Sequence, residues 1–497
     1  MNRFKLDDRV GFSRFPTSGS LPLWNQRQAQ TGIILAGCLG MIYTQLTMSS
    51  TTIEYARSLG ADAFHIGLLG ALPAATLFTQ FLAAVIANHL RYRRKLWLTV
   101  AIIQRSLFIP LAIGTWLDPR LADSTWLWLF VGLSASNHLL LHFCSPLWLS
   151  WMGDYLPRER LNRIWGSRQF WMQWAGALAL LAGAIHLATS GLTTRYAFSI
   201  HLLLGAAFGI ADLLIFLKIE EPPVTPMPIP RLRTVLSAPF RDRNFRSFIA
   251  FTSFWQVAAN TGAPFISYFL LTHIGLTVQD VMLLWTCSWG GGAVLCGKMG
   301  HLSERVGNRP LLILCIAFKS LNMIALIFLP RDPQIAFWIL VPVFIIDAVL
   351  NAGVAIATNG FLLKNSPAAN RTMYIAAGTA VAGLAGGATA ITTGIVIVAL
   401  GQMNIQVNGR TFTAFHVAFF ASILLRLIAV PLVRSVRETE SQSTREVVTQ
   451  LIGMTPFRVL RFPIGLYRSY PPLRDNTASE RDAATSSNQP QTASKAC

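Results

Sequence analysis

The stretch GHLSERVGNR, residues 300–309, lies between two long apolar runs and predicts the fold class. The run before it covers residues 279–299, and the run after it covers residues 311–330. Each is as long as a helix needs to cross a hydrocarbon core, which takes roughly 20 apolar residues. The stretch itself concentrates glycine, one acid and two arginines, a composition typical of a short polar connection between two membrane spans.

Composition extends this interpretation to the whole chain. Of its 497 residues, 53% are hydrophobic and only 13% are charged, whereas a soluble protein carries about 25% charged residues. The sequence therefore predicts an all-α membrane protein of twelve transmembrane helices. The expected spans are 32–54, 64–88, 96–117, 125–151, 167–189, 196–217, 247–272, 279–299, 311–330, 335–358, 373–401 and 413–433.

The positive charges indicate the orientation of these spans. The chain has 41 Lys and Arg against 22 Asp and Glu, a net charge of +19. When the connections are counted in turn, 33 of the cations fall on one side of the membrane, 5 on the other and 3 inside the spans. By the positive-inside rule, both termini are expected in the cytoplasm. The excess charge is then an orientation signal, and no nucleic-acid partner is predicted.

The two halves of the chain repeat a pattern. Lys95 precedes Arg105 by ten residues in the third span, and Arg309 precedes Lys319 by ten in the ninth. Similarly spaced histidines precede Asp212 in the sixth span and Arg426 in the twelfth, which indicates a duplicated six-helix unit. The predicted organisation is a tail (1–30), a first bundle (31–217), a linker (218–246), a second bundle (247–434) and a partly interfacial, then disordered, tail (435–497).

From about residue 31 to 434, the chain resembles the major facilitator superfamily of the bacterial type. Residues 300–309 resemble the family's loop between the eighth and ninth helices, with Glu304 in place of Asp and Asn308 in place of Arg. In the first half, Asn88 stands where the family has its acid, so the resemblance implies no equivalent lock there. The resemblance assigns a gating role to Gly300, Glu304, Arg305, Gly307 and Arg309.

The resemblance also implies an architecture and an activity. Two pseudo-symmetric six-helix bundles would enclose a cavity between helices 1, 4, 7 and 10, with helices 3, 6, 9 and 12 outside. The implied function is secondary transport by alternating access, without covalent chemistry, so no enzyme activity is expected.

Charged residues inside the spans are the first functional candidates. Lys319 and Arg105 lie ten residues past their cytoplasmic connections, near the midplane, and Asp347 reaches a similar depth from the other side. A charge at a helix centre costs at least about 2.5 kcal/mol and needs a partner or water, so a Lys319–Asp347 pair is predicted. Asp347 is interpreted either as a proton-coupling carboxylate or as half of a permanent ion pair. A structural role is favoured for the four charged residues that lie on outer helices, which are Arg105, Lys319, Asp212 and Arg426.

Polar residues on helices 1, 4, 7 and 10 are the candidates for substrate binding. Their hydroxyls, amides and indoles suit a neutral or zwitterionic polar solute such as a sugar, although hydrogen bonding between helices uses the same residue types. His138 and His142 share a helix face, but without a third ligand no metal site is predicted. The substrate-binding candidates are Tyr43, Gln45, Asn137, His138, Trp255, Gln256, Asn260 and Asn351.

The sequence favours a proton-coupled secondary transporter, in symport, that moves a small organic solute across a bacterial cytoplasmic (inner) membrane. The expected partners are the solute, protons and the bilayer; no cofactor or metal is expected, and the chain is expected to be monomeric. Two alternatives remain open: an exporter of amphipathic compounds, and a transporter-like protein that no longer transports and acts as a sensor or scaffold.

Overall fold

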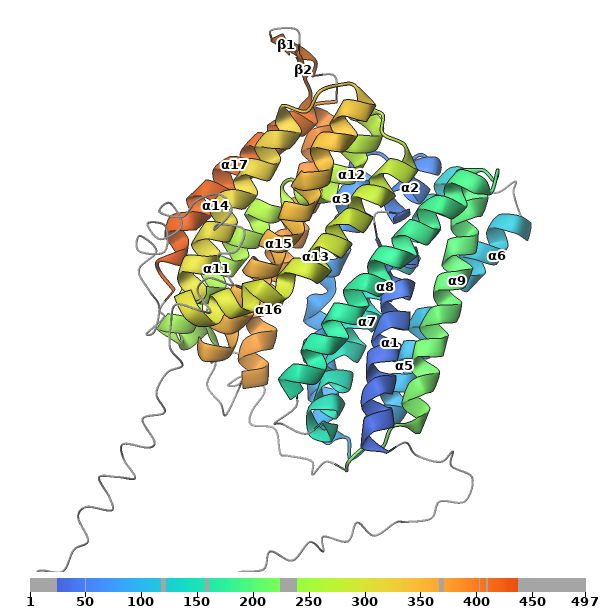
Figure 1. The fold of residues 1–497 in the computed structure, drawn as a ribbon, viewed down its shortest axis with the longest axis vertical. Helices are drawn as coiled ribbons and strands as arrows, with labels where there is room; N and C mark the ends of the chain where they lie inside the picture. Colours follow the sequence, from blue (N-terminus) through green and yellow to red (C-terminus); the bar gives the residue numbers. More distant parts are fainter. Residues whose placement is uncertain are drawn as a thin grey trace, which may run out of the picture.

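The computed structural model describes residues 25–49, 51–117, 122–156, 161–223, 239–365, 371–401, 403–407 and 410–436. Its helices form two bundles that lie side by side, one from each half of the chain (Figure 1). The N-terminal tail before residue 25, most of the expected linker and the tail after residue 436 lie outside the described residues.

Each half supplies a series of helices at the expected positions. The first half contains α1 (Gln26–Thr47), α2 (Thr51–Ser58), α3 (Ala63–Ala75), η1 (Thr76–Phe78), α4 (Thr79–His89), α5 (Arg94–Ser106), α6 (Ile109–Leu117), α7 (Asp123–Tyr155), α8 (Leu161–Thr189), α9 (Thr194–Ile215) and η3 (Phe216–Lys218). The second half contains α11 (Arg243–Asn260), η4 (Ala263–Phe265), α12 (Ile266–Phe269), η5 (Leu270–Ile274), α13 (Val278–Val306), α14 (Asn308–Ile327), α15 (Pro333–Asn365), α16 (Arg371–Ala399) and α17 (Ala414–Val433).

Prolines explain where two of the spans break. Pro110 is the second residue of α6, and α5 ends four residues before it; Pro264 follows the end of α11 by the same spacing. Proline has no N–H to donate to the carbonyl four residues earlier, so a helix is interrupted at these points. The seventh span then continues as short 3₁₀, α and π turns until Gly275, whose φ of +79° closes it.

The all-α membrane fold is confirmed. Within the described ranges, ten helical segments are long and apolar enough to cross a membrane, and they match expected spans one to six and nine to twelve. The seventh span is the broken α11–η5 segment, and the eighth is α13, which carries three consecutive glycines at 290–292. The count of twelve spans stays a prediction for these two.

Large apolar side chains cover the outside of both bundles. Leu117 is 78% exposed and Trp338 is 70% exposed, and many other leucines, isoleucines and phenylalanines point outward. Water would disfavour so much continuous apolar surface, whereas lipid chains accept it. The polar and charged side chains of the spans are instead turned inward, where they build the sites described below.

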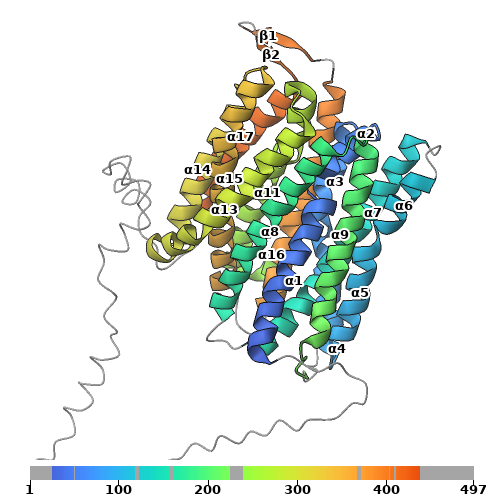
Figure 2. The same ribbon diagram turned by 45° about the vertical axis from the view of Figure 1, so that its right-hand side comes forward.

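The two halves meet along two pairs of helices. One pair is α3 with α16, and the other is α8 with α13, whose ribbons run next to each other in Figure 2. A Cβ on Gly67 would lie 2.6 Å from the carbonyl oxygen of Ala390, and one on Gly394 would lie 2.6 Å from that of Ala63. Only glycine permits so close an approach of two backbones.

Two features differ from the expected organisation. A small antiparallel hairpin of β1 (Ile405–Val407) and β2 (Arg410–Phe412) connects α16 to α17, where the sequence predicts no strand. In addition, α11 begins at Arg243, so the expected linker, 218–246, ends inside a helix. Asp242 caps that helix by accepting hydrogen bonds from the N–H groups of Asn244 and Phe245.

Candidate functional site

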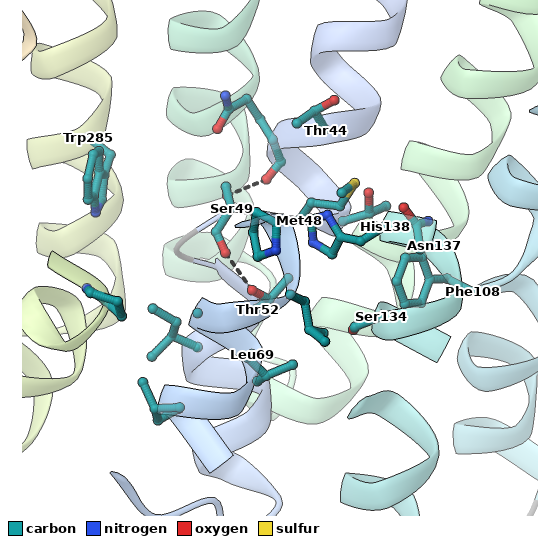
Figure 3. Close-up of a pocket in the computed structure, with 18 of the residues that line it drawn as sticks. Thr44, Met48, Ser49, Thr52, Leu69, Phe108, Ser134, Asn137, His138 and Trp285 are labelled. Carbon is teal, nitrogen blue, oxygen red and sulfur yellow. Dashed lines mark hydrogen bonds between the residues drawn. The ribbon is translucent and has the colours of Figure 1, made fainter. Parts of the chain in front are cut away.

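A cavity of about 440 Å³ lies where the two halves meet. The first half lines most of it, through residues of α1, α2, α3 and α7, and the second half contributes Pro264, Trp285 and Trp289. In Figure 3, Trp285 faces Thr44, Ser134 and His138 across this space. The wall combines hydroxyls, amides and one imidazole with apolar and indole surfaces, as pockets for small organic molecules do.

The cavity collects some of the predicted substrate-binding residues. Gln45, Asn137 and His138 line it, whereas Tyr43 is fully buried behind the wall. Trp255, Gln256, Asn260 and Asn351 belong to the second half and line neither this cavity nor the smaller one described later.

A neutral hydrogen-bond network backs the cavity. The Nε2 of Gln104 donates to the hydroxyl of Tyr43 at 3.1 Å and to Oδ1 of Asn137 at 2.8 Å. The Nδ2 of Asn137 donates in turn to the Tyr43 hydroxyl. These three side chains, from α1, α5 and α7, are all buried, so the network fixes the packing of three helices.

His138 contributes an imidazole to the wall. Its Nδ1 is buried and has no hydrogen-bond partner within the described part of the chain. Its ring stacks on that of His142, with centroids 6.3 Å apart, and the Nε2 of His142 lies 2.8 Å from the carbonyl oxygen of Pro73. No group of three or more metal-ligating side chains occurs in the ranges that the structure describes.

The first half holds a buried ion pair between its third and sixth spans. Arg105 on α5 donates to Oδ2 of Asp212 on α9 at 2.9 Å, and its guanidinium lies 4.1 Å from the ring centroid of Tyr43. The backbones of Gly40 and Gly209 make room for this pair. A Cβ on Gly40 would lie 2.8 Å from the Asp212 carboxylate, and one on Gly209 would lie 2.6 Å from the Arg105 side chain.

The second half holds a larger polar cluster around Asp347 on α15. The Nζ of Lys319, on α14, donates to Oδ1 of Asp347 at 2.6 Å, which is the pair that helix depth predicts. Asn322 donates to the same oxygen at 2.8 Å, and Asn351 donates to the other oxygen at 2.7 Å. Lys319 also donates to Oδ1 of Asn351. The Asp347 side chain keeps 29% of its surface exposed, whereas that of Lys319 keeps 6%.

Two further groups of predicted residues lie in the second half. Arg426, on α17, is 1% exposed; it donates to the carbonyl oxygen of Lys319 at 3.0 Å and lies over the ring of Trp255. Asn260 donates to the side chain of Gln256 at 3.1 Å, one turn away on α11. A Cβ on Gly386 of α16 would lie 2.7 Å from Asn260, so these amides are packed against the neighbouring helix.

The predicted gating residues lie at the junction of α13 and α14. Gly300, Glu304 and Arg305 are still helical, because α13 runs to Val306 and leaves Gly307, with φ +92°, as the only residue between the two helices. Arg309 donates to the carbonyl oxygens of Arg434 and Val436, just past the end of α17.

The first half has its own ties at the same end of the bundle, although the resemblance implies none. Arg94 donates to the carbonyl oxygens of Leu217 and Ile219 at the end of α9. Arg93 pairs with Asp154 at 3.0 Å, and Glu221 accepts hydrogen bonds from the N–H groups that open α5. Asp154 and Glu221 therefore supply acids at this end of the first half.

Several residues of these sites were missed by the sequence analysis. Gln104 lies one residue before Arg105, and Asn322 lies three residues after Lys319. These short distances from predicted charges are the sequence signal that identifies both residues as candidates. Trp285 and Trp289 lie on the eighth span, where the resemblance places no cavity. Arg168 is the second residue of the expected span 167–189, but α8 begins seven residues before it, at Leu161, and its side chain reaches the wall of a cavity.

Comparisons with known proteins agree with this architecture. The family model described as Major Facilitator Superfamily matches residues 33–390. No curated protein matches the chain.

Solved structures of low sequence identity share the fold. A mutant of the nucleoside transporter NupG has a TM-score of 0.63 at 14% identity, covering 82% of this chain and 100% of that chain. The D-xylose-proton symporter has a TM-score of 0.62 at 14% identity, covering 84% and 99%. A bacterial homolog of the human lysosomal transporter Spinster has a TM-score of 0.54 at 19% identity, covering 83% and 95%.

Proposed function

The chain belongs to the Major Facilitator Superfamily, and we propose that this multi-pass membrane protein is a proton-coupled secondary transporter of a small organic solute. Transport proceeds by alternating access, in which the two bundles rock about the cavity between them. The protein works in a bacterial cytoplasmic membrane with both termini in the cytoplasm, the orientation that the excess of Lys and Arg in the expected cytoplasmic connections favours.

The main support for proton coupling is the environment of Asp347. A carboxylate in a membrane helix is costly and marks an ion or proton pathway when water reaches it. Asp347 is partly exposed, and Lys319, Asn322 and Asn351 stabilise its charged form. Protonation would remove the attraction to Lys319 and free the ammonium for another partner. Binding of a proton is thereby linked to the packing of α14 against α15.

The cavity supports the choice of substrate class. Its volume of about 440 Å³ falls within the roughly 300–1,000 Å³ of pockets that hold small organic ligands. The wall presents the hydroxyls of Thr44, Ser134 and Thr52 and the imidazole of His138, with Trp285 opposite. These groups suit a neutral or zwitterionic polar solute that hydrogen-bonds on one side and stacks on an indole on the other.

Transport by purified protein in proteoliposomes tests the proposal. A thermal-shift screen against sugars, amino acids and peptides first selects a solute that stabilises the protein. We expect wild-type protein to accumulate that solute when an inward proton gradient is imposed. The Asp347→Asn variant should still exchange labelled for unlabelled solute but should lose gradient-driven accumulation.

A matched control lies on the same helix. Asp332 accepts hydrogen bonds from the N–H groups of Gln334 and Ile335 at the start of α15. The variant Asp332→Asn keeps this cap and should accumulate solute as wild type does. If accumulation in the wild type ignores the gradient, or Asp347→Asn accumulates normally, proton coupling through Asp347 is wrong.

A further inference from the structure

A second cavity, of about 220 Å³, lies entirely within the first bundle. It is lined by α1, α5, α7, α8 and α9, in the part of the bundle that the predicted orientation assigns to the cytoplasmic side. Three charged side chains reach its wall: Arg105, Arg168 and Asp212. Three aromatic rings, of Trp97, Trp148 and Phe216, form much of the rest.

The charges around this cavity do not balance. Arg105 uses the carboxylate of Asp212, at 2.9 Å, and no ion pair joins Arg168 to a carboxylate among the residues that the structure describes. The Nε of Arg168 is buried without a hydrogen-bond partner in the same part of the chain, as is the Nε of Arg105. Two guanidinium groups thus share one internal counterion inside a membrane bundle.

Arg168 is held in place by rings and not by an acid. Its guanidinium carbon lies 4.8 Å from the ring centroid of Trp148 and 5.5 Å from that of Trp165. Its side chain crosses α1 at Gly37, where a Cβ would lie 2.8 Å from Nε. Stacking of this kind orients a guanidinium but leaves its in-plane N–H groups available for an anion.

We infer that this cavity binds the carboxylate of a small organic anion between Arg168 and Arg105. A planar guanidinium matches a carboxylate bidentately, and the rings of Trp97, Trp148 and Phe216 give the organic part of the ligand an apolar surface. A volume of about 220 Å³ limits that part to roughly the size of one aromatic ring.

The inference rests on the proposed function: Thr44 lines both cavities, so the second one lies next to the proposed solute site. Among the small organic solutes of the proposed function it selects those that carry a carboxylate, and it adds simple organic anions to the neutral and zwitterionic solutes proposed above.

The test compares a carboxylate with its neutral amide. Purified full-length protein in detergent is titrated with benzoate and, separately, with benzamide, and the midpoint of thermal unfolding is recorded. We expect benzoate to stabilise the wild type at concentrations at which benzamide does not. Inorganic phosphate forms a third arm: if it stabilises as well as benzoate does, the site recognises charge alone and the organic-carboxylate assignment is wrong.

Substitution of Arg168 locates the effect. Arg168→Gln should weaken the apparent affinity for benzoate by about tenfold or more. Arg168→Lys keeps the charge but loses the planar guanidinium, so its affinity for benzoate should lie between those of the wild type and Arg168→Gln. The matched control is Arg195→Gln, since Arg195 also lies on a tryptophan ring in the first half, at 5.5 Å from Trp126, but pairs with Asp123. Its benzoate response should equal that of the wild type.

The outcomes separate the two proposals. Equal responses to benzoate and benzamide in the wild type, or an unchanged benzoate response in Arg168→Gln, overturn the anion site even if proteoliposomes transport another solute. If Arg168→Gln does not fold, the comparison of wild type with Arg168→Lys decides instead. A benzoate response that depends on Arg168, in a protein that moves no solute across vesicles, keeps the site and overturns the transport function.

Discussion

The two halves of this protein place charge at equivalent positions of a repeated unit and pair it differently. In the first half, the repeat positions Arg105 and Asp212 bind each other, and both side chains are nearly buried, at 13% and 6% exposure. In the second half, the equivalent positions are both cations, Lys319 and Arg426, and the acid comes from α15. The side chain of that acid, Asp347, is 29% exposed.

This difference separates a structural pair from a candidate for coupling. A pair enclosed on both sides ties two helices together, because breaking it leaves a charge without water or partner. Asp347, whose side chain is 29% exposed, is the carboxylate that we propose exchanges a proton. The two halves thus hold two charge clusters, and we expect their stability to respond differently to the same substitution.

The largest expected effect comes from neutralising the first-half acid. Asp212→Asn leaves Arg105 buried without a counterion, so we expect the free energy of unfolding to fall by about 3–5 kcal/mol. Asp347→Asn should cost less, about 1–2 kcal/mol, because an ammonium left without its acid can neutralise by losing a proton, which a guanidinium cannot, and the new amide oxygen can still accept from Lys319. Chemical denaturation in detergent micelles measures both.

The double variant Arg105→Gln with Asp212→Asn is the control for this pair. Removing both charges should restore most of the stability lost in Asp212→Asn. Equal losses in the two single Asp variants would contradict the distinction between the halves.

The contact between the halves allows a second test. A Cβ at Gly383 of α16 would overlap the carbonyl oxygen of Ala74 on α3, whereas a Cβ at Gly132 of α7 would meet nothing within 4 Å. We expect Gly383→Ala to cost about 1–3 kcal/mol and Gly132→Ala to be neutral or slightly stabilising. Thermal unfolding followed by tryptophan fluorescence compares them. A neutral Gly383→Ala would mean that the halves do not pack as closely as α3 and α16 do here.

A smaller effect is expected in the neutral network of the first half. Tyr43→Phe removes the hydroxyl that Gln104 and Asn137 both reach, while the bond between those two amides remains. The expected loss is about 1 kcal/mol, the usual net value of one buried hydrogen bond. Denaturation under the same conditions measures it, with Tyr92→Phe, at a half-exposed surface tyrosine, as the control. A loss as large as that of Asp212→Asn would mean that the network, and not the ion pair, holds the first half together.

The sequence predicts most of the fold because hydropathy and loop charge act over whole spans. It also predicts the pairing of Lys319 with Asp347, because both depths follow from counting residues along a helix. It does not predict the pairing of Arg105 with Asp212, since that depends on how α5 and α9 are rotated about their axes. For the same reason the sequence leaves Arg168 at the edge of the expected span 167–189. Whether its side chain meets water or a cavity depends on how α8, which begins at Leu161, is placed in the bundle.

The smallest expected effect concerns the ends of the bundles, where the two halves are alike. Arg94 binds two carbonyl oxygens at the end of α9, and Arg309 binds two just past the end of α17. A cation at a helix C-terminus contributes about 0.3–1 kcal/mol, so Arg94→Gln and Arg309→Gln should each lower the free energy of unfolding by that amount. The control is Arg27→Gln, at an exposed arginine near the start of α1. Equal losses would mean that these ties are a shared structural property of the repeat. A loss confined to Arg309→Gln would mean that Asp154 and Glu221 stabilise this end of the first half without Arg94. The two ends would then share a geometry but not a contribution to stability.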